Sequence, residues 1–173
     1  RILAEKRGIR IGLPMALEFL ESIPYWRALF TALGFEVVLS RKSSYELFEK
    51  GLKGIPSDTV CFPAKLGHGH VRDLIERKVD RIFWPMMIRL PKRNRTAQGS
   101  EMCPVVQGYP MLVEKSDEPL ARHGIPLDHP TFHGYNRRLK HNQTVAYIHR
   151  AFGVPERSEE PTSELQSPNT ISY

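Results

Sequence analysis

The sequence predicts an α/β fold: a Rossmann-like, doubly wound, mostly parallel sheet of four to five strands with helices on both faces. Short apolar runs of strand length alternate with longer segments whose apolar residues recur at helical spacing, as in βαβ units. Gly, Pro and Ser residues stand between these segments, where strands and helices usually end. The length of 173 residues fits one domain.

Residues 9–13 are predicted to form the first strand, which ends before Pro14. A helix follows, with its apolar residues on one side and Gly34 at its end. Pro24 is expected to split this helix, because an interior proline lacks a backbone donor and clashes with the preceding turn. Residues 35–39 then form a short buried strand.

The middle of the chain repeats the alternation. A short helix is predicted at residues 43–52, with Ser43 or Ser44 as its cap. A longer helix at residues 63–78 follows, with a proline near its start. Residues 81–84 form the third strand, which a proline stops.

The last third of the chain is predicted to add one or two strands. Residues 89–101 hold many basic and polar residues and read as an exposed loop. A fourth strand is expected at residues 105–106 and a helix at 110–122. A fifth strand at 125–127 and a basic helix at 134–152 complete the fold.

Both ends of the chain are expected to lie outside this domain. Residues 1–8 are polar and read as a connector from a missing upstream region, so that the chain is a fragment. Residues 9–156 form the single domain, and residues 157–173 match the translation of a sequencing adapter, although a natural polar tail remains an alternative.

Composition describes a basic globular protein, with 40% hydrophobic and 25% charged residues and a formal net charge of +6. Without the adapter-like segment, which holds one Arg and three Glu, the net charge is +8. Such a charge suits nucleic acid, an anionic cofactor or an acidic neighbouring domain. No apolar run has membrane-span length and the start lacks signal-peptide order, so the sequence predicts a cytoplasmic protein without membrane contact.

The two cysteines are the most informative residues. Cys61 stands just before the helix at 63–78, and Cys103 is followed by Pro104. The amino end of a helix favours the thiolate, which is the form that binds metal or attacks an electrophile. Two such thiols in a chain this poor in cysteine look like a site, assembled in the crevice outside the carboxyl ends of the strands.

Two thiolates alone cannot complete a tetrahedral zinc site or a four-iron cluster. Further ligands would come from His68 or His70, from sequence outside this chain or from exogenous groups. The two histidines are two positions apart, which on a helix points them to different sides. The alternative is that Cys61 and Cys103 are buried and act as small hydrophobic residues.

A family resemblance covers most of the predicted domain. The stretches that carry it are Ile11-Gly12-Leu13-Pro14, Pro24-Tyr25-Trp26, residues 33–40, residues 55–65 with His68-Gly69-His70, Phe83-Trp84-Pro85, and residues 103–110. In these stretches the chain resembles the domain of unknown function in acyl-CoA dehydratase activase-related proteins, the family of fused 2-hydroxyglutaryl-CoA dehydratase activators.

The resemblance implies that Cys61 and Cys103 ligate an iron–sulfur cluster, of the 4Fe-4S type, whose ligand set is incomplete in this fragment. It implies partners within one parent chain: an upstream ATP-dependent activase domain and a downstream dehydratase-like domain. Acyl-CoA is a further partner that it suggests. No Gly-rich phosphate loop occurs in the chain, so the fragment alone is expected not to hydrolyse ATP.

The leading hypothesis is therefore an iron–sulfur module that takes part in ATP-driven, low-potential electron transfer. Lys65, His68 and His70 are its candidate cofactor contacts: Lys65 for an anionic cluster or phosphate, and the histidines for hydrogen bonds to cluster sulfurs. Helix packing around Gly69 and a surface position for one histidine are the plainer readings. A docking domain with structural cysteines is the alternative function. A nucleic-acid binder is a third, which rests on net charge alone, and the basic residues near Arg138 more often form a solvated helix face.

Overall fold

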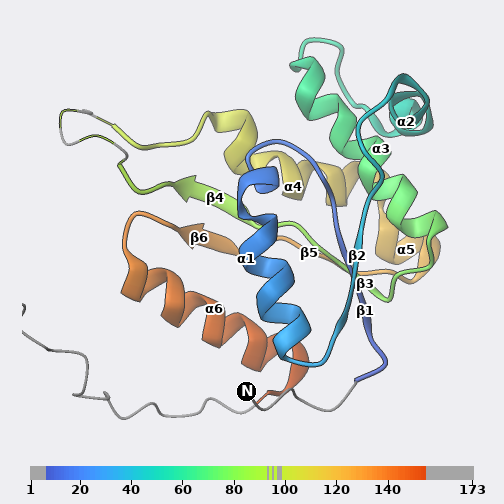
Figure 1. Cartoon of the computed structure of the whole chain (residues 1–173). Coiled ribbons are helices and arrows are strands. Elements are labelled where there is room, and N and C mark those ends of the chain that lie inside the picture. Colours follow the sequence, from blue (N-terminus) through green and yellow to red (C-terminus); the bar gives the residue numbers. More distant parts are fainter. Residues whose placement is uncertain (1–6, 93, 95, 97–98, 155–173) are drawn as a thin grey trace, which may run out of the picture.

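Four parallel strands form the main sheet of the computed structural model, which describes residues 7–92, 94, 96 and 99–154. Their order is β2 (Glu36–Leu39), β1 (Arg10–Leu13), β3 (Arg81–Phe83) and β5 (Leu127–Asp128) (Figure 1). Ile11 of β1 pairs with Val37 on one side and with Arg81 on the other. The predicted α/β class with a mostly parallel sheet is confirmed. Residues 1–6 of the predicted connector and the adapter-like segment 157–173 lie outside the described residues.

The helices follow the strands in the alternation that the sequence predicts. In chain order they are α1 (Phe19–Ala32), α2 (Tyr45–Gly51) with the 3₁₀ turn η1 (Leu52–Gly54), α3 (Phe62–Glu76), α4 (Pro104–Asp117), α5 (Pro119–His123) and α6 (Arg137–Phe152).

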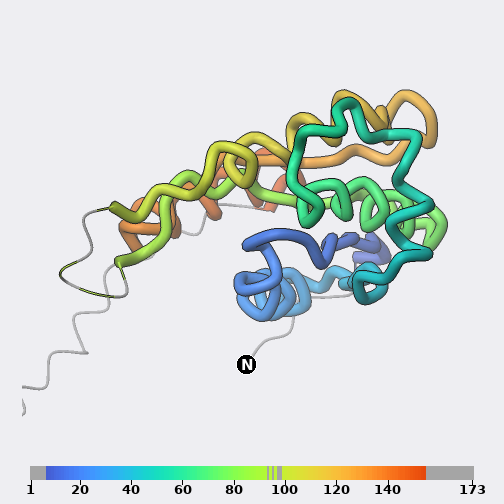
Figure 2. Tube along the Cα trace, turned by 90° about the horizontal axis from the view of Figure 1, so that it is seen from above, coloured from blue at the N-terminus to red at the C-terminus, as the bar shows by residue number. Residues whose placement is uncertain are grey.

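Helices cover both faces of the sheet. Two neighbouring residues at the end of β3 show this, because successive side chains of a strand point to opposite faces. The Phe83 ring contacts Trp26 of α1 and Tyr147 of α6, with centroid distances of 4.5 and 5.1 Å. The Trp84 ring lies on the other face, 6.5 Å from that of Tyr109 in α4. Figure 2 shows α1 on one side of the strands and α3 and α4 on the other.

A second, two-stranded parallel sheet was not predicted. It pairs β4 (Met86–Arg89) with β6 (Thr131–His133), where the sequence prediction ended the third strand at a proline and placed no further strand directly after it. Pro85 separates β3 from β4, and Pro130 separates β5 from β6. Hydrogen bonds nevertheless continue across the break, since Trp84 N–H donates to the Asp128 carbonyl at 2.9 Å and Met86 N–H donates to that of Pro130 at 3.0 Å.

Two local predictions are wrong. Residues 105–106 lie in the first turn of α4 and not in a strand, because Pro104 has its ring-fixed φ at the first helical position and sets the helix there. Pro24 does not split α1, which is continuous from Phe19 to Ala32. The carbonyl that an amide at position 24 would bind belongs to Leu20, which is exposed, so that water can replace the missing donor.

The helix ends also differ in part from the prediction. The segment predicted as one helix at 110–122 is two helices, because Glu118 has a φ of 47° and breaks the run between α4 and α5. The last helix begins at Arg137, and Asn136 caps it through a hydrogen bond of 3.0 Å from Leu139 N–H. Of the predicted loop at 89–101, Arg89 ends β4 and forms a bridge with Glu101.

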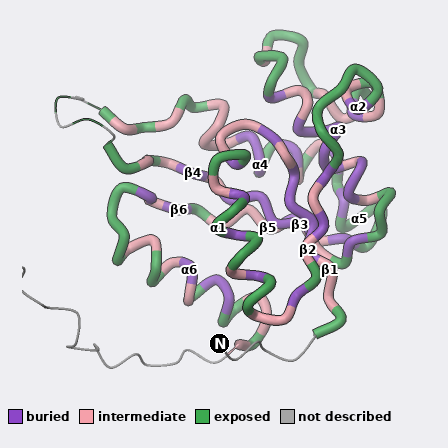
Figure 3. The backbone as a smooth tube through the Cα atoms, in the orientation of Figure 1, coloured by how far each residue is buried: buried purple, intermediate pink, exposed green. Residues whose placement is uncertain are grey.

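The core is aromatic and joins both sheets. Trp26 is fully buried, and its ring lies 5.1 Å from that of Phe132 in β6. Buried residues concentrate on the main sheet and on the middle of α3 in Figure 3, while the loop before α3 is exposed. Among the described residues, none of the helices combines the length and apolarity that crossing a membrane requires.

Candidate functional site

Cys61 occupies the cap position of α3. Its backbone is extended, with φ −61° and ψ 146°, and Pro63 follows within the first turn. The side chain accepts no capping hydrogen bond, and the thiol is free and exposed. Cys61 therefore lies at the positive end of the helix dipole, with its thiol unengaged.

Cys103 occupies the same position in α4. Its φ of −59° and ψ of 144° match those of Cys61 within 2°, and Pro104 is the first helical residue. This thiol is also free, exposed and without a capping hydrogen bond. The alternative of two buried cysteines acting as hydrophobic residues is wrong, because both are exposed.

The two capped helices pack against each other through His68. This residue lies two turns beyond Cys61 and is fully buried. Its Nδ1 is 2.9 Å from Oδ2 of Asp117, and its Nε2 is 3.0 Å from the hydroxyl of Tyr109, both on α4. A carboxylate only accepts, so in the neutral imidazole Nδ1–H donates to Asp117 and Nε2 accepts from Tyr109.

Tyr109 links this network to the cysteine end of α3. It is buried, and burial is the main cause that raises its pKa to about 12. Electrostatic interactions with Cys61 and Asp117 raise the Tyr109 pKa further. The hydroxyl therefore stays protonated and remains a donor to His68, within electrostatic range of the Cys61 sulfur.

His70 points to another part of the fold. Its Nδ1 lies 2.8 Å from Oγ of Ser40, just after β2, and its Nε2 lies 3.1 Å from Oγ of Ser43. Burial lowers the pKa of His70 to about 4, although the charge of Asp73 opposes the shift. Hydroxyl groups donate and accept, so they satisfy a neutral imidazole in either tautomer.

The predicted divergence of the two histidines is confirmed. His68 contacts α4, while His70 contacts the segment between β2 and α2. The plain reading of Gly69 is also confirmed, because a Cβ there would collide with the backbone carbonyl of Leu47 in α2. A surface position for either histidine is wrong, since both are fully buried.

Lys65 lies one turn into α3, on the side of the preceding loop. Its Nζ donates to the Asp58 carbonyl at 2.8 Å. The lysine therefore holds the loop before Cys61. The assignment of Lys65, His68 and His70 as contacts to a cofactor stays a prediction.

Cys61 and Cys103 are the right type of ligand for an iron–sulfur cluster, but two cysteines are too few to complete one. Thiolates are the usual ligands of such clusters, and four are normally needed. Within residues 7–92, 94, 96 and 99–154, no group of three or more Cys, His, Asp or Glu side chains is placed to hold a metal. Both ring nitrogens of His68 and of His70 have protein partners. Among the described residues, therefore, no third Cys, His, Asp or Glu side chain is grouped with the two thiols to hold a metal.

Sequence reasoning missed three residues that surround the candidates: Ser40, Tyr109 and Asp117. Ser40 follows a buried strand, where a polar residue marks the strand end, and this was the available signal. Tyr109 and Asp117 are eight positions apart on α4 and meet one imidazole from different turns. Only the packing of α3 on α4 brings them together.

Fold and site together define a class of protein: a parallel α/β domain that presents two free thiols at the amino ends of two packed helices. The chain belongs to the family described as CoA enzyme activase uncharacterised domain (DUF2229), whose model matches residues 10–163. This confirms the resemblance that the sequence carries. No curated protein matches the chain.

Proposed function

We propose that this domain contributes Cys61 and Cys103 as two ligands of an iron–sulfur cluster, in a protein related to 2-hydroxyacyl-CoA dehydratase systems. The observation that carries the proposal is the equivalence of the two cysteines. They are the only cysteines of the chain, and each is exposed, free and at the cap of one of two packed helices. Structural cysteines are usually buried, whereas ligands must be reachable.

A bound cluster would supply one-electron transfer at low potential. The cap positions support binding, because the backbone N–H groups of a helix amino end stabilise the negative charge that cluster and thiolates carry. The missing ligands would come from the partner domains of the same parent chain, which we take to be an upstream ATP-dependent activase domain and a downstream dehydratase-like domain. Acyl-CoA is the substrate class that this arrangement would serve.

Anaerobic reconstitution with iron, sulfide and an added small thiol tests the proposal, since the thiol replaces the missing ligands. The wild-type chain should develop charge-transfer absorption at about 400 nm. Cys61→Ser and Cys103→Ser should each lower the iron bound per chain, and Thr59→Ala, in the same exposed loop, should not. Absence of the band from the wild type, or its survival in the Cys61→Ser/Cys103→Ser double variant, would overturn the assignment.

A docking domain is the second candidate, and a specific surface favours it. Tyr45, Phe48 and Phe62 form a row of rings beside Cys61, with successive centroid distances of 6.1 and 5.0 Å. Tyr45 and Phe62 are 70% and 53% exposed, which is unusual for neighbouring aromatic residues. Loss of co-elution with the activase domain in Phe62→Ser, together with no cluster in the wild type, would favour docking over ligation.

A further inference from the structure

Two neighbouring hollows lie apart from the cysteines, one at the amino ends of β1 and β3 and the other along the edge strand β5. Both use Arg81, at the start of β3, and Ala151, near the carboxyl end of α6. Their volumes are about 440 and 480 Å³, within the roughly 300–1,000 Å³ typical of small-molecule sites. Neither includes Cys61, Cys103 or the residues around them.

The charges of the 440 Å³ hollow do not balance. Its one carboxylate, Asp128, is already engaged, because its Oδ2 accepts hydrogen bonds of 2.6 Å from both the Arg81 guanidinium and the Tyr147 hydroxyl. Burial raises the pKa of Tyr147, so this hydroxyl stays a donor. Arg150 and His129 also line the hollow, and within the part of the chain that the structure describes neither has a hydrogen-bond or ion-pair partner.

The N–H groups that remain point to an anion. Arg81 uses one terminal nitrogen on Asp128, which leaves further guanidinium donors beside those of Arg150 and the ring of His129. Arg150 lies in the last turn of α6, where the negative end of the helix dipole offsets part of its charge. The excess positive charge is therefore confined to this hollow. Binding of an anion would use N–H donors from several of its residues together.

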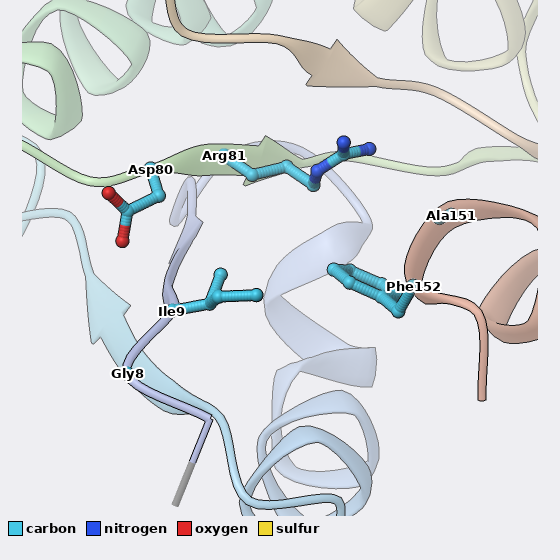
Figure 4. Close-up of a pocket in the computed structure, with 6 residues that line it drawn as sticks. All are labelled: Gly8, Ile9, Asp80, Arg81, Ala151 and Phe152. Carbon is cyan, nitrogen blue, oxygen red and sulfur yellow. The ribbon is translucent and has the colours of Figure 1, made fainter.

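The 480 Å³ hollow does not share this character. Asp80 lines it, and the Asp80 carboxylate accepts the backbone N–H of Arg10 at 2.7 Å. Figure 4 shows the Arg81 side chain extending toward α6 and away from Asp80, over the ring of Phe152. The Arg81 guanidinium instead pairs with Asp128, which lines the 440 Å³ hollow.

We propose that the hollow between Arg81, His129 and Arg150 binds the phosphate group of a small molecule. Guanidinium groups bind phosphate oxygens through paired hydrogen bonds, and the ion pair with Asp128 holds Arg81 in place for this. The site is separate from the cysteines and does not depend on a cluster. The phosphate group belongs either to inorganic pyrophosphate or to a phosphorylated metabolite such as a nucleotide.

Isothermal titration of the full chain at about 0.15 M salt tests this site. The probes are pyrophosphate, ADP and a single-stranded oligonucleotide. The wild type should bind pyrophosphate or ADP saturably, with Kd below about 1 mM. Arg150→Gln should weaken binding by at least about tenfold. Arg138→Gln is the matched control, because it removes the same charge from the exposed first turn of the same helix, outside both hollows.

Tighter binding of ADP than of pyrophosphate would support a nucleotide, and equal or tighter binding of pyrophosphate would support the inorganic anion. Equal weakening by Arg150→Gln and Arg138→Gln would mean that the whole basic helix attracts anions, and it would overturn the proposal. Tightest binding of the oligonucleotide would overturn it as well. Circular dichroism establishes that both variants are folded, and binding unchanged by Arg150→Gln would count against the site even if the wild type binds.

Discussion

Nδ1 of His68 lies 2.9 Å from Oδ2 of Asp117, which joins the middle of α3 to the last residue of α4. Both residues are almost completely buried. Asp117→Ala should therefore leave a buried imidazole nitrogen without its acceptor and lower the free energy of unfolding by about 2 kcal/mol. Urea unfolding measures this loss. Asp58→Ala, at an exposed position, is the control and should change the free energy by less than about 0.5 kcal/mol.

Glycines at the crossing of α2 and α3 permit the close approach of these helices. A Cβ on Gly69 would meet the Leu47 carbonyl, and one on Gly51 would meet the backbone of Gly69. Gly69→Ala should therefore destabilise the fold by about 3 kcal/mol, because backbone and not a flexible side chain must move. Gly108→Ala in α4 is the matched control, since no atom lies within 4 Å of the added methyl group. It should be neutral or stabilising, by up to about 1 kcal/mol.

His70 should make stability fall in acid. Its pKa is about 4 in the fold, below the ordinary value of 6.5, because burial disfavours the imidazolium. The unfolded chain thus binds more protons between these values, and stability is present above pH 6.5 and lost as the pH falls toward 4. Urea midpoints of wild type and His70→Gln, compared at pH 4.5 and 7, measure this. A similar acid loss in His70→Gln would show that another group is responsible.

Glu18 should have the opposite effect on the pH dependence of stability: it should make stability fall as the pH rises. Burial raises the pKa of its carboxyl group from 4.5 to about 7, although the nearby backbone N–H groups of Glu18 and Phe19 oppose the shift. The stability from its neutral form is complete below pH 4.5 and is lost as the pH rises through 7. Glu18→Gln should therefore raise the thermal midpoint at pH 8 more than at pH 5. An equal change at both values would contradict this reading.

Much of the fold could be predicted because its signals are local. Hydrophobic period and Gly or Pro boundaries predicted β1, β2, β3, α3 and α6 within a few residues. β4 and β6 were missed because each begins directly after a proline, Pro85 or Pro130, and a proline was taken as the end of a strand. Residues 105–106 are β-branched and suggested a strand, but the proline before them favours a helix start.

The candidate site was predictable only in part for the same reason. The place of Cys61 before a helix follows from its neighbours in sequence, and so does the divergence of His68 and His70. The partners of these histidines are 27 to 49 positions away in the sequence, so their hydrogen bonds depend on tertiary packing. The exposure of the two cysteines likewise depends on how α2 and α4 pack around them, which the local sequence does not determine.

Pro85 and Pro130 bend two neighbouring parallel strands at about the same level, and this has a consequence for cooperativity. The bend divides the strands into two sheets, yet Met87 of β4 and Phe132 of β6 remain buried in the same cluster as Ile11 and Phe83. Neither sheet can therefore lose its side-chain packing while the other keeps it. The domain should melt as one unit, with the calorimetric enthalpy equal to the van't Hoff enthalpy.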